Sequence, residues 1–400
     1  MRSWKANYTA VLIAEVLAII GFGLSIPIIP LFLEEDIGMT DPVKLKVWVG
    51  LINSGTAVAM AIFAPIWGHL ADIYSRRAML LRAMFGGAIL ISFLAFVNSP
   101  LQLLVLKTIQ GCITGTVAAA TVLVVGITPA SQVAFALGLL QTGVAVGSSL
   151  GPLIGGLLSD FFGHRIAFFS TGLFLGLGGL IVLKGVDKDT KPRIEGEHKK
   201  FSLIPDIKPI VSSPILISLL FVTFGVQAAN AVALPLLPLF LKSLVQNISA
   251  ESSYIASTSG VVLGVGAAAA ALAAVLAGKV STRIGYWTTL ILCLGAGALV
   301  TAPQALVTNV PQLIILRALS SFFIGGTMPV INAIIAVSSE KNNQGTIFGF
   351  NSSVAFVGAA IGPMIGSASA MISYRAVFLA SAAVLGISVL ETIRQRKKSA

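Results

Sequence analysis

Three ionisable residues, Glu15, Lys107 and Arg317, stand within long apolar stretches of this sequence. An ionised side chain in such surroundings costs about 2.5 kcal/mol or more, so residues of this kind are usually paired or functional. Desolvation favours the neutral form of a carboxylic acid, which suits Glu15 to taking up a proton and releasing it again. In a second interpretation Glu15 simply reaches water, because it lies only a turn or two into its stretch. Arg317 is equally well explained as a structural charge satisfied by helix ends and water.

The elements that must position these residues are long and apolar. Of the 400 residues 56% are hydrophobic and only 10% are charged, whereas soluble domains carry about 25% charged residues. About 20 apolar residues cross the ~30 Å hydrocarbon core of a bilayer. The sequence therefore predicts an all-α membrane protein with twelve transmembrane helices, at approximately 9–33, 47–68, 78–98, 101–125, 133–157, 166–185, 213–240, 255–277, 287–305, 311–336, 344–367 and 373–391.

A repeat divides the chain into two halves. The segment Ile26–Leu33, with its two prolines, returns 208 positions later as Leu234–Leu241, and Gly151-Pro152 returns 211 positions later as Gly362-Pro363. We therefore predict an N-terminal six-helix bundle over 1–185, a cytoplasmic linker over 186–210 and a C-terminal six-helix bundle over 211–400. Duplicated bundles of this kind are typical of transporters with a site near the bilayer midplane, although repeats also occur in scaffolds and sensors.

The distribution of basic residues predicts the orientation. The net charge of +11 is also compatible with nucleic-acid binding, but the Lys and Arg residues gather in alternate connections. This asymmetry favours a multi-pass protein of the inner (plasma) membrane with both termini in the cytoplasm. Cys112 and Cys293 both fall within predicted helices, so neither a disulfide framework nor a cysteine-rich metal site is expected.

The connection between the second and third predicted helices carries a recognisable motif. Gly68-His69-Leu70-Ala71-Asp72-Ile73-Tyr74-Ser75-Arg76-Arg77 resembles the loop motif of the major facilitator superfamily, with Ile73 in place of Arg and Ser75 in place of Gly. The resemblance implies that Gly68, Asp72, Arg76 and Arg77 form a cytoplasmic gate. The alternative is a loop whose arginines only hold orientation.

The fifth predicted helix carries a second motif, made of Gly138, Gly147, Gly151, Pro152, Gly155 and Gly156. It resembles the antiporter motif of the twelve-helix drug:proton exporters of that superfamily. Gly147, Gly151 and Gly155 recur every four residues and leave one bare helix face, to which another backbone can approach. We expect the partner to be the predicted helix at 255–277, whose Gly266, Ala270 and Ala274 form a similar face. A single motif of this type is more often ordinary helix packing.

The resemblance also bears on the ionisable residues. Glu15 stands twelve positions before Pro27, as does an acid in some multidrug exporters of the superfamily, where it serves cation recognition and proton exchange. Lys107 stands three residues before Gln110-Gly111, where the family has Arg, whose role is proton coupling. The resemblance thus implies proton coupling by Glu15, Lys107 and Arg317, the last being the repeat counterpart of Lys107. Lys keeps the charge of Arg but, unlike Arg, can lose its proton.

Polar and aromatic residues at membrane depth are candidates for a substrate cavity with few fixed charges, which suits lipophilic or weakly cationic compounds. Some of the polar ones will instead bridge helices. The candidates are Phe22, Asn53, Gln110, Gln141, Gln227, Asn230, Asn332 and Asn351.

These features predict a secondary active transporter, not an enzyme, that exports lipophilic or weakly cationic drugs in exchange for protons by alternating access. The partners expected are a small-molecule substrate, protons and the lipid bilayer, with a monomeric chain and no nucleic acid, metal or cofactor. No phosphate-binding loop of the Gly-x-x-x-x-Gly-Lys-Ser/Thr type is present, so ATP is not expected as the energy source. The alternatives are an exporter or flippase of a siderophore, metabolite or lipid, a proton-linked uptake carrier, and a sensor that binds without transport.

Overall fold

The computed structural model describes residues 3–73, 75–187, 208–246, 254–339 and 344–399. Within them twelve helical stretches are long and apolar enough to cross a membrane, which confirms the predicted class and number of helices. Several crossings consist of two consecutive helices. The longer elements are α1 (Trp4–Leu24), α3 (Pro42–Ile73), α4 (Arg76–Leu94), α5 (Pro100–Ile113), α6 (Thr116–Ile127), α7 (Val133–Phe162), α8 (His164–Gly185), α10 (Pro214–Ala233), α11 (Leu237–Gln246), α12 (Ile255–Ile284), α13 (Tyr286–Thr301), α14 (Val310–Gly325), α15 (Thr327–Ser338), α16 (Gln344–Ile372) and α17 (Tyr374–Ser399).

Side-chain caps fix where several of these helices begin. The side chains of Ser75, Ser99, Ser213 and Asn309 each accept a hydrogen bond from a backbone N–H in the first turn of the helix that follows. A helix leaves its first N–H groups without intrahelical partners, and such caps satisfy one of them. Proline occupies the first position of α5 and α10, where its missing N–H costs nothing.

The chain packs as two units, which we describe separately. Unit 1 contains the described residues of Met1–Trp48, Gly55–Gly196 and Leu241–Gly264, and unit 2 those of Val49–Ser54, Glu197–Phe240 and Val265–Ala400. Each unit thus takes most of its residues from one sequence half. Most of the linker predicted over 186–210 lies outside the described residues, so the boundaries 1–185 and 211–400 stay a prediction.

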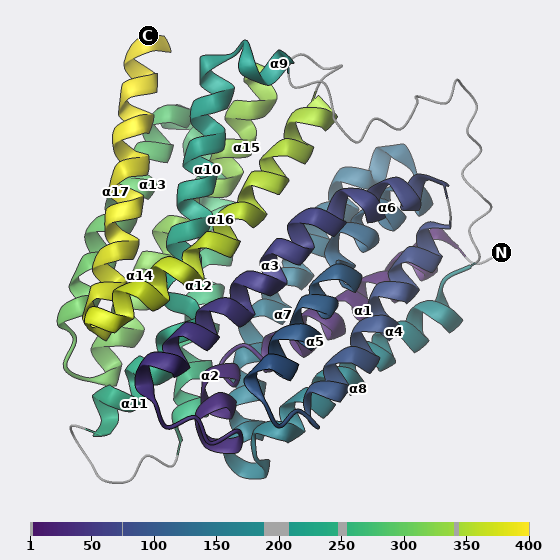
Figure 1. Ribbon diagram of the computed structural model, residues 1–400. Helices are drawn as coiled ribbons and strands as arrows, with labels where there is room; N and C mark the ends of the chain where they lie inside the picture. The colour runs from purple at the N-terminus through teal and green to yellow at the C-terminus, as the bar shows by residue number, and fades with distance from the viewer. Residues whose placement is uncertain (1–2, 74, 188–207, 247–253, 340–343, 400) are drawn as a thin grey trace. The chain divides into compact units, whose positions relative to one another are not determined.

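In unit 1, α1 packs along α7 and α8 (Figure 1). The contact with α7 is made by the glycine face: a Cβ at Gly147 would lie 2.9 Å from Ile19, one at Gly151 2.7 Å from Gly23, and one at Gly155 2.2 Å from the Leu24 carbonyl oxygen. These approaches require glycine. Gly147, Gly151 and Gly155 are therefore buried against α1, and the prediction that this glycine face packs on the small face of 255–277 is wrong.

The start of α12 does meet α7, through different residues. A Cβ at Gly156 would lie 2.3 Å from the Ala256 carbonyl oxygen, and one at Gly260 2.2 Å from that of Pro152. The Ser149 hydroxyl also donates to the Gly264 carbonyl oxygen at 2.8 Å. The small face that was predicted as the partner, formed by Gly266, Ala270 and Ala274, instead packs on α14 within unit 2. A Cβ at Gly325 of α14 would lie 2.5 Å from Ala270.

Unit 2 repeats the packing of unit 1. Gly358, Gly362 and Gly366 of α16 lie against α10, with a Cβ at Gly362 placed 2.5 Å from the Ala228 carbonyl oxygen. The hydrogen bonds repeat as well: Thr171 donates to the Gly21 carbonyl oxygen at 2.8 Å, and Ser381 donates to that of Ala229 at 2.8 Å. The two donors are 210 positions apart and the two acceptors 208. The sequence repeat therefore corresponds to a repeat in helix packing.

Proline interrupts the first and seventh membrane segments at equivalent places. After α1 the chain turns at Pro27 and resumes as α2 (Ile29–Leu31) and a π-helix (Phe32–Asp36). After α10 it passes through a 3-10 helix (Leu234–Leu236) containing Pro235 into α11. Proline lacks the N–H that would continue the helical hydrogen bonding, which accounts for both interruptions.

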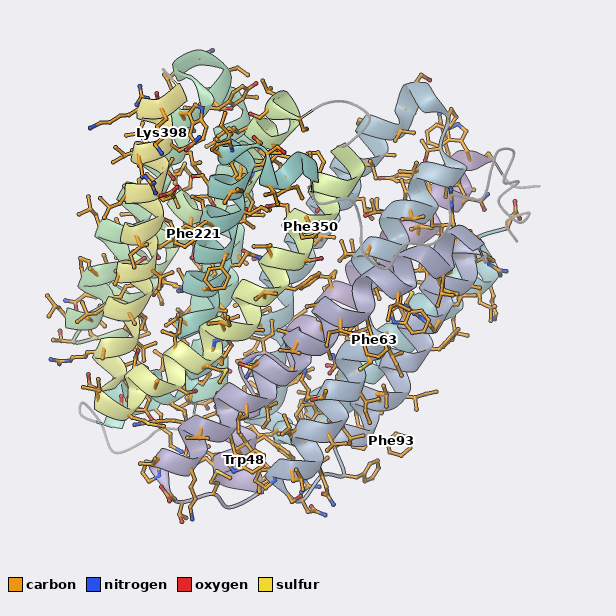
Figure 2. All side chains as sticks on the ribbon, turned by 45° about the horizontal axis from the view of Figure 1, so that its top comes forward. Trp48, Phe63, Phe93, Phe221, Phe350 and Lys398 are labelled. Atoms are coloured by element: carbon orange, nitrogen blue, oxygen red, sulfur yellow. The ribbon has the colours of Figure 1, made fainter. Side chains whose placement is uncertain are left out.

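Large apolar side chains cover much of the outer surface of each unit. Phe93, which is 54% exposed, points away from the helices in Figure 2, and Phe221 is 46% exposed. Apolar surface of this extent is unusual for a soluble protein and is what a lipid-facing surface requires. Basic residues instead gather in the last turn of α17, at Arg396, Lys397 and Lys398.

Candidate functional site

Glu15 is buried in the interior of unit 1. Its side chain has no exposed surface, and its Oε1 accepts a hydrogen bond of 2.9 Å from the Thr116 hydroxyl, at the start of α6. Its Oε2 is buried without a hydrogen-bond partner among the described residues. This geometry contradicts the interpretation in which Glu15 reaches water near a surface. The carboxyl group is thus buried, with one oxygen that has no hydrogen-bond partner among the described residues.

Other predicted site residues of unit 1 lie on α1 and α5. A Cβ at Gly87 of α4 would lie 3.9 Å from the Phe22 ring and 3.2 Å from the Thr114 methyl group. The Phe22 and Thr114 side chains therefore both lie beside Gly87. Lys107 is 8% exposed and Gln110 6% exposed, and the Gln110 Oε1 is buried with no partner in the described structure. Among the described residues Lys107 has no carboxylate partner within 4.0 Å. Lys107 is therefore a buried amine without a carboxylate beside it in the described part of the chain.

A second polar cluster lies in unit 2. The Thr223 hydroxyl donates to the Asn351 Oδ1 at 2.7 Å, and the Asn351 amide donates to the Asn332 Oδ1 at 3.3 Å. These contacts join α10, α16 and α15, and Asn351 is only 3% exposed. Asn332 and Asn351 are therefore brought together as a bridge between helices. Arg317 of α14 lies beside Gly266, where a Cβ would be 3.6 Å from its Cγ.

The remaining candidates are dispersed. The Asn53 amide donates to the Val49 carbonyl oxygen of its own helix, Gln141 is exposed, and Gln227 and Asn230 are half-buried on α10. Their part in a substrate cavity stays a prediction. The surroundings of Gly68 and the side chain of Asp72 lie outside the described part of the structure. Of the predicted gate, Arg76 lies over Gly126, and Arg77 donates to the Leu183 carbonyl oxygen.

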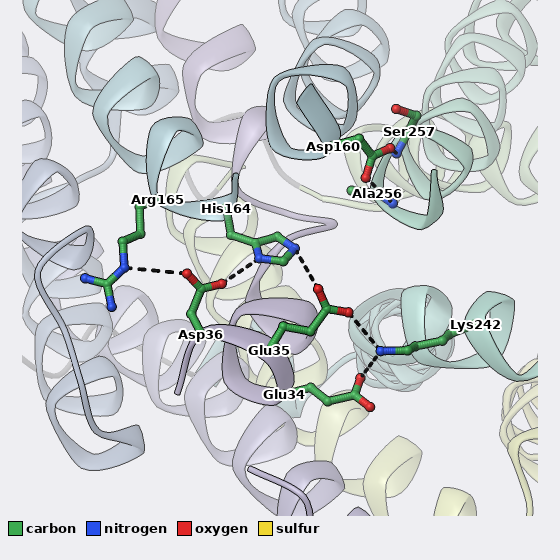
Figure 3. A network of polar contacts seen from close by, with 9 residues as sticks. All are labelled: Glu34, Glu35, Asp36, Asp160, His164, Arg165, Lys242, Ala256 and Ser257. Carbon is green, nitrogen blue, oxygen red and sulfur yellow. Dashed lines mark hydrogen bonds and ion pairs between the residues drawn. The ribbon is translucent and has the colours of Figure 1, made fainter. Parts of the chain in front are cut away.

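A network of charged residues that the sequence did not predict lies at the end of the first membrane segment. The π-helix presents Glu34, Glu35 and Asp36 in succession (Figure 3). Asp36 contacts His164 at 2.6 Å and Arg165 at 3.5 Å, both at the start of α8. Lys242 of α11 contacts Glu34 at 3.1 Å and Glu35 at 2.8 Å. The three acids thus join the π-helix, α8 and α11.

Asp160 near the end of α7 is a further residue that sequence reasoning passed over. Its carboxylate accepts hydrogen bonds from the backbone N–H groups of Ala256 at 3.2 Å and Ser257 at 2.7 Å (Figure 3). These belong to the first turn of α12, so Asp160 caps a helix distant in sequence. A carboxylate at a helix N-terminus is favourable because of the helix dipole.

The Asp36 contacts support a stability prediction. Asp36→Asn should lower the free energy of unfolding by about 1–3 kcal/mol. The substitution removes the carboxylate charge that His164 and Arg165 contact, at a position where the Asp36 side chain is only 20% exposed. The matched control is Asp41→Asn, since the Asp41 side chain is 45% exposed and its pair with Lys44 at 3.8 Å is a surface contact. An Asn side-chain oxygen can also keep the hydrogen bonds that Asp41 accepts from the Val43 and Lys44 N–H groups. Thermal unfolding of the purified protein in detergent measures both. Equal midpoints for the two variants would show that the Asp36 contacts add nothing to stability.

Comparison with known proteins agrees with this fold. The family model described as Major Facilitator Superfamily matches residues 11–308 and 256–399. A protein named multidrug resistance protein MdtG from Proteus mirabilis (strain HI4320) is 33% identical over 390 residues, covering 97% of this chain and 95% of the relative. A protein of the same name from Salmonella arizonae (strain ATCC BAA-731 / CDC346-86 / RSK2980) is 33% identical over 385 residues, covering 96% of this chain and 93% of the relative.

Among solved structures, a bacterial homologue of the human lysosomal transporter Spinster has a TM-score of 0.80 at 14% identity, covering 99% of this chain and 98% of that one. At this identity the likeness concerns the fold alone. The helices, the duplicated packing and the family match agree over nearly the whole chain, and this protein is therefore a multi-pass membrane protein that belongs to the Major Facilitator Superfamily.

Proposed function

We propose that this chain is a secondary active transporter of the inner membrane, with both termini in the cytoplasm, that exports lipophilic or weakly cationic small molecules in exchange for protons. The full-length similarity to relatives named multidrug resistance proteins supports the substrate class. The observation that carries the proton exchange is the fully buried carboxyl group of Glu15. In dry surroundings its neutral form is favoured, and it needs a change of environment to give its proton up.

Alternating access provides that change. Glu15 takes a proton when the site opens to the outer side and releases it to the cytoplasm, while the substrate moves in the opposite direction. A substrate with apolar surface enters a site whose nearby groups include the ring of Phe22, and a positive charge on the substrate favours the ionised form of Glu15. Binding of the substrate and loss of the proton are then linked, which is what exchange requires.

Inverted membrane vesicles test the function directly. With ethidium as the probe and no ATP, an acid interior should drive dye into vesicles that contain the protein, and a protonophore should abolish the uptake. Vesicles from cells without the protein give the background. Movement of the dye only in the opposite direction would indicate an uptake carrier, and binding without movement would indicate a sensor; either result contradicts the proposal.

Lys107 gives a second test of the proton pathway. If it serves as a fixed positive charge, Lys107→Arg should keep proton-driven export near the wild-type rate and Lys107→Ala should lose it, because Arg stays charged at every accessible pH. We expect this outcome, since the family normally has Arg here. Export rates over a pH series at matched expression measure it. Failure of the Arg variant would assign the proton release to Lys107 itself, and full activity of the Ala variant would remove Lys107 from the mechanism.

A further inference from the structure

The fourth membrane segment is broken where it passes Glu15. It ends as α5 at Ile113 and restarts as α6 at Thr116. We infer that this break builds the proton site: Thr116 is a positioning residue that holds Glu15 Oε1, so that Oε2 is the atom that binds the proton. The inference rests on the proposed function, in which Glu15 carries the proton, and it assigns the site's second residue and its geometry.

The contact between the two residues is made in the core of unit 1. Glu15 is 0% exposed and Thr116 2% exposed, and the hydroxyl-to-Oε1 distance is 2.9 Å. A hydroxyl donor is compatible with both charge states of the acid, because Oε1 accepts the hydrogen bond whether or not Oε2 carries a proton. Proton uptake therefore changes the charge of the site from −1 to 0 without disturbing the Thr116 contact.

The backbone at the break explains how the hydroxyl reaches the acid. Thr114 is extended, with ψ 170°, and Gly115 has φ +143°, a conformation that side-chain-bearing residues rarely adopt. Gly115 is the N-cap of α6 and provides no side-chain cap. The first-turn N–H groups of α6 thus lack a capping side chain, and the positive end of the helix dipole favours a carboxylate beside Thr116. The Thr116 bond to Oε1 places the Glu15 carboxyl group beside the first residue of α6, and its buried Oε2 has no hydrogen-bond partner among the described residues.

The second half of the chain provides an internal comparison. Its tenth membrane segment is broken at the equivalent place, between α14 and α15, with Gly326 and Thr327 standing 211 positions after Gly115 and Thr116. There Gly326 keeps a helical φ of −75°, and the Thr327 hydroxyl donates to the Ile324 carbonyl oxygen of the preceding turn. The position 208 residues after Glu15 is Thr223, which donates to Asn351. The positive φ at Gly115 and a threonine hydroxyl that donates to another helix thus occur in the half that contains Glu15.

The test compares pH profiles of proton-driven ethidium export for three variants of the full chain. Thr116→Val removes the hydroxyl and keeps the shape, so the profile should move to higher pH by about one unit, because the ionised acid loses the hydrogen bond that favours proton release. Thr116→Ser should keep the wild-type profile. The control is Thr121→Val, since the Thr121 hydroxyl donates to the Val117 carbonyl oxygen within α6; its profile should not move.

The outcomes separate this inference from the proposed function. An unmoved profile for Thr116→Val, with export still lost in Glu15→Gln, would overturn the role of Thr116 and leave Glu15 as the proton carrier. Retained proton-driven export in Glu15→Gln would overturn both. If Thr116→Val does not fold, Thr116→Cys replaces the hydroxyl with a weaker donor and should give a smaller shift in the same direction. A wild-type profile for the Cys variant would also overturn the inference.

Discussion

Glu15→Gln is expected to reduce proton-driven export to the rate of vesicles without the protein. The amide cannot bind and release a proton, and the structure provides no second carboxylate beside Thr116 among the described residues. The folded state should survive, because the amide oxygen of Gln can still accept the Thr116 hydrogen bond and a buried charge is removed at no loss of volume. The measurement is uptake of ethidium into inverted vesicles under an imposed pH gradient.

The matched control is Glu391→Gln on α17, which makes the same chemical change in a pair with Arg394, whose side chain is 66% exposed. It should export at the wild-type rate. Thermal unfolding of both variants in detergent separates loss of function from loss of folded protein. Export by Glu15→Gln that still follows the pH gradient would disprove the coupling role of Glu15.

Gly151→Leu should prevent unit 1 from assembling. A Cβ at this position would already lie 2.7 Å from the Gly23 Cα and the Ile20 carbonyl oxygen, which are backbone atoms that cannot move aside singly. Even Gly151→Ala should cost about 1–3 kcal/mol, the usual range for overpacking, and the leucine variant should cost more. The yield of monodisperse protein after detergent extraction and its unfolding temperature measure the effect.

Gly138 gives the comparison on the same helix, because a Cβ there would meet nothing within 4 Å. Gly138→Leu should therefore purify with the wild-type unfolding temperature. A Gly151→Leu protein that is as stable as the Gly138 variant would show that α1 and α7 do not approach each other this closely.

Most of the fold was predictable because lipid imposes simple constraints on sequence. Backbone polar groups must be satisfied within each segment, so crossings appear as long apolar helices, and the repeated prolines and glycines locate the duplication. The interruptions within crossings were harder to predict. Gly115 and Gly326 both stand at breaks, yet glycines are frequent throughout these helices, and nothing in the local sequence distinguishes a break from a packing contact.

The candidate site was predicted in part. Glu15 is identifiable because a carboxylate in an apolar stretch is conspicuous, whereas Thr116 is one of many hydroxyl residues and is 101 positions away. The partner of the glycine face was wrongly assigned for a similar reason: the spacing identifies a bare face, but several helices have a face that fits it. Pairing between helices depends on their arrangement in three dimensions, which a single sequence does not contain.

The presence of Thr223 at the repeat position of Glu15 has an electrical consequence. The two equivalent positions of the repeat hold Glu15 and Thr223, and only Glu15 has a carboxyl group. Under the proposed exchange, one proton traded at Glu15 for an uncharged compound moves one net charge, so each 100 mV of membrane potential contributes about 2.3 kcal/mol to export. The same proton traded for a monovalent cation moves none. With one acid site, the proposed exchange predicts that export of uncharged compounds depends on the membrane potential, whereas export of monovalent cations is driven by the pH gradient alone.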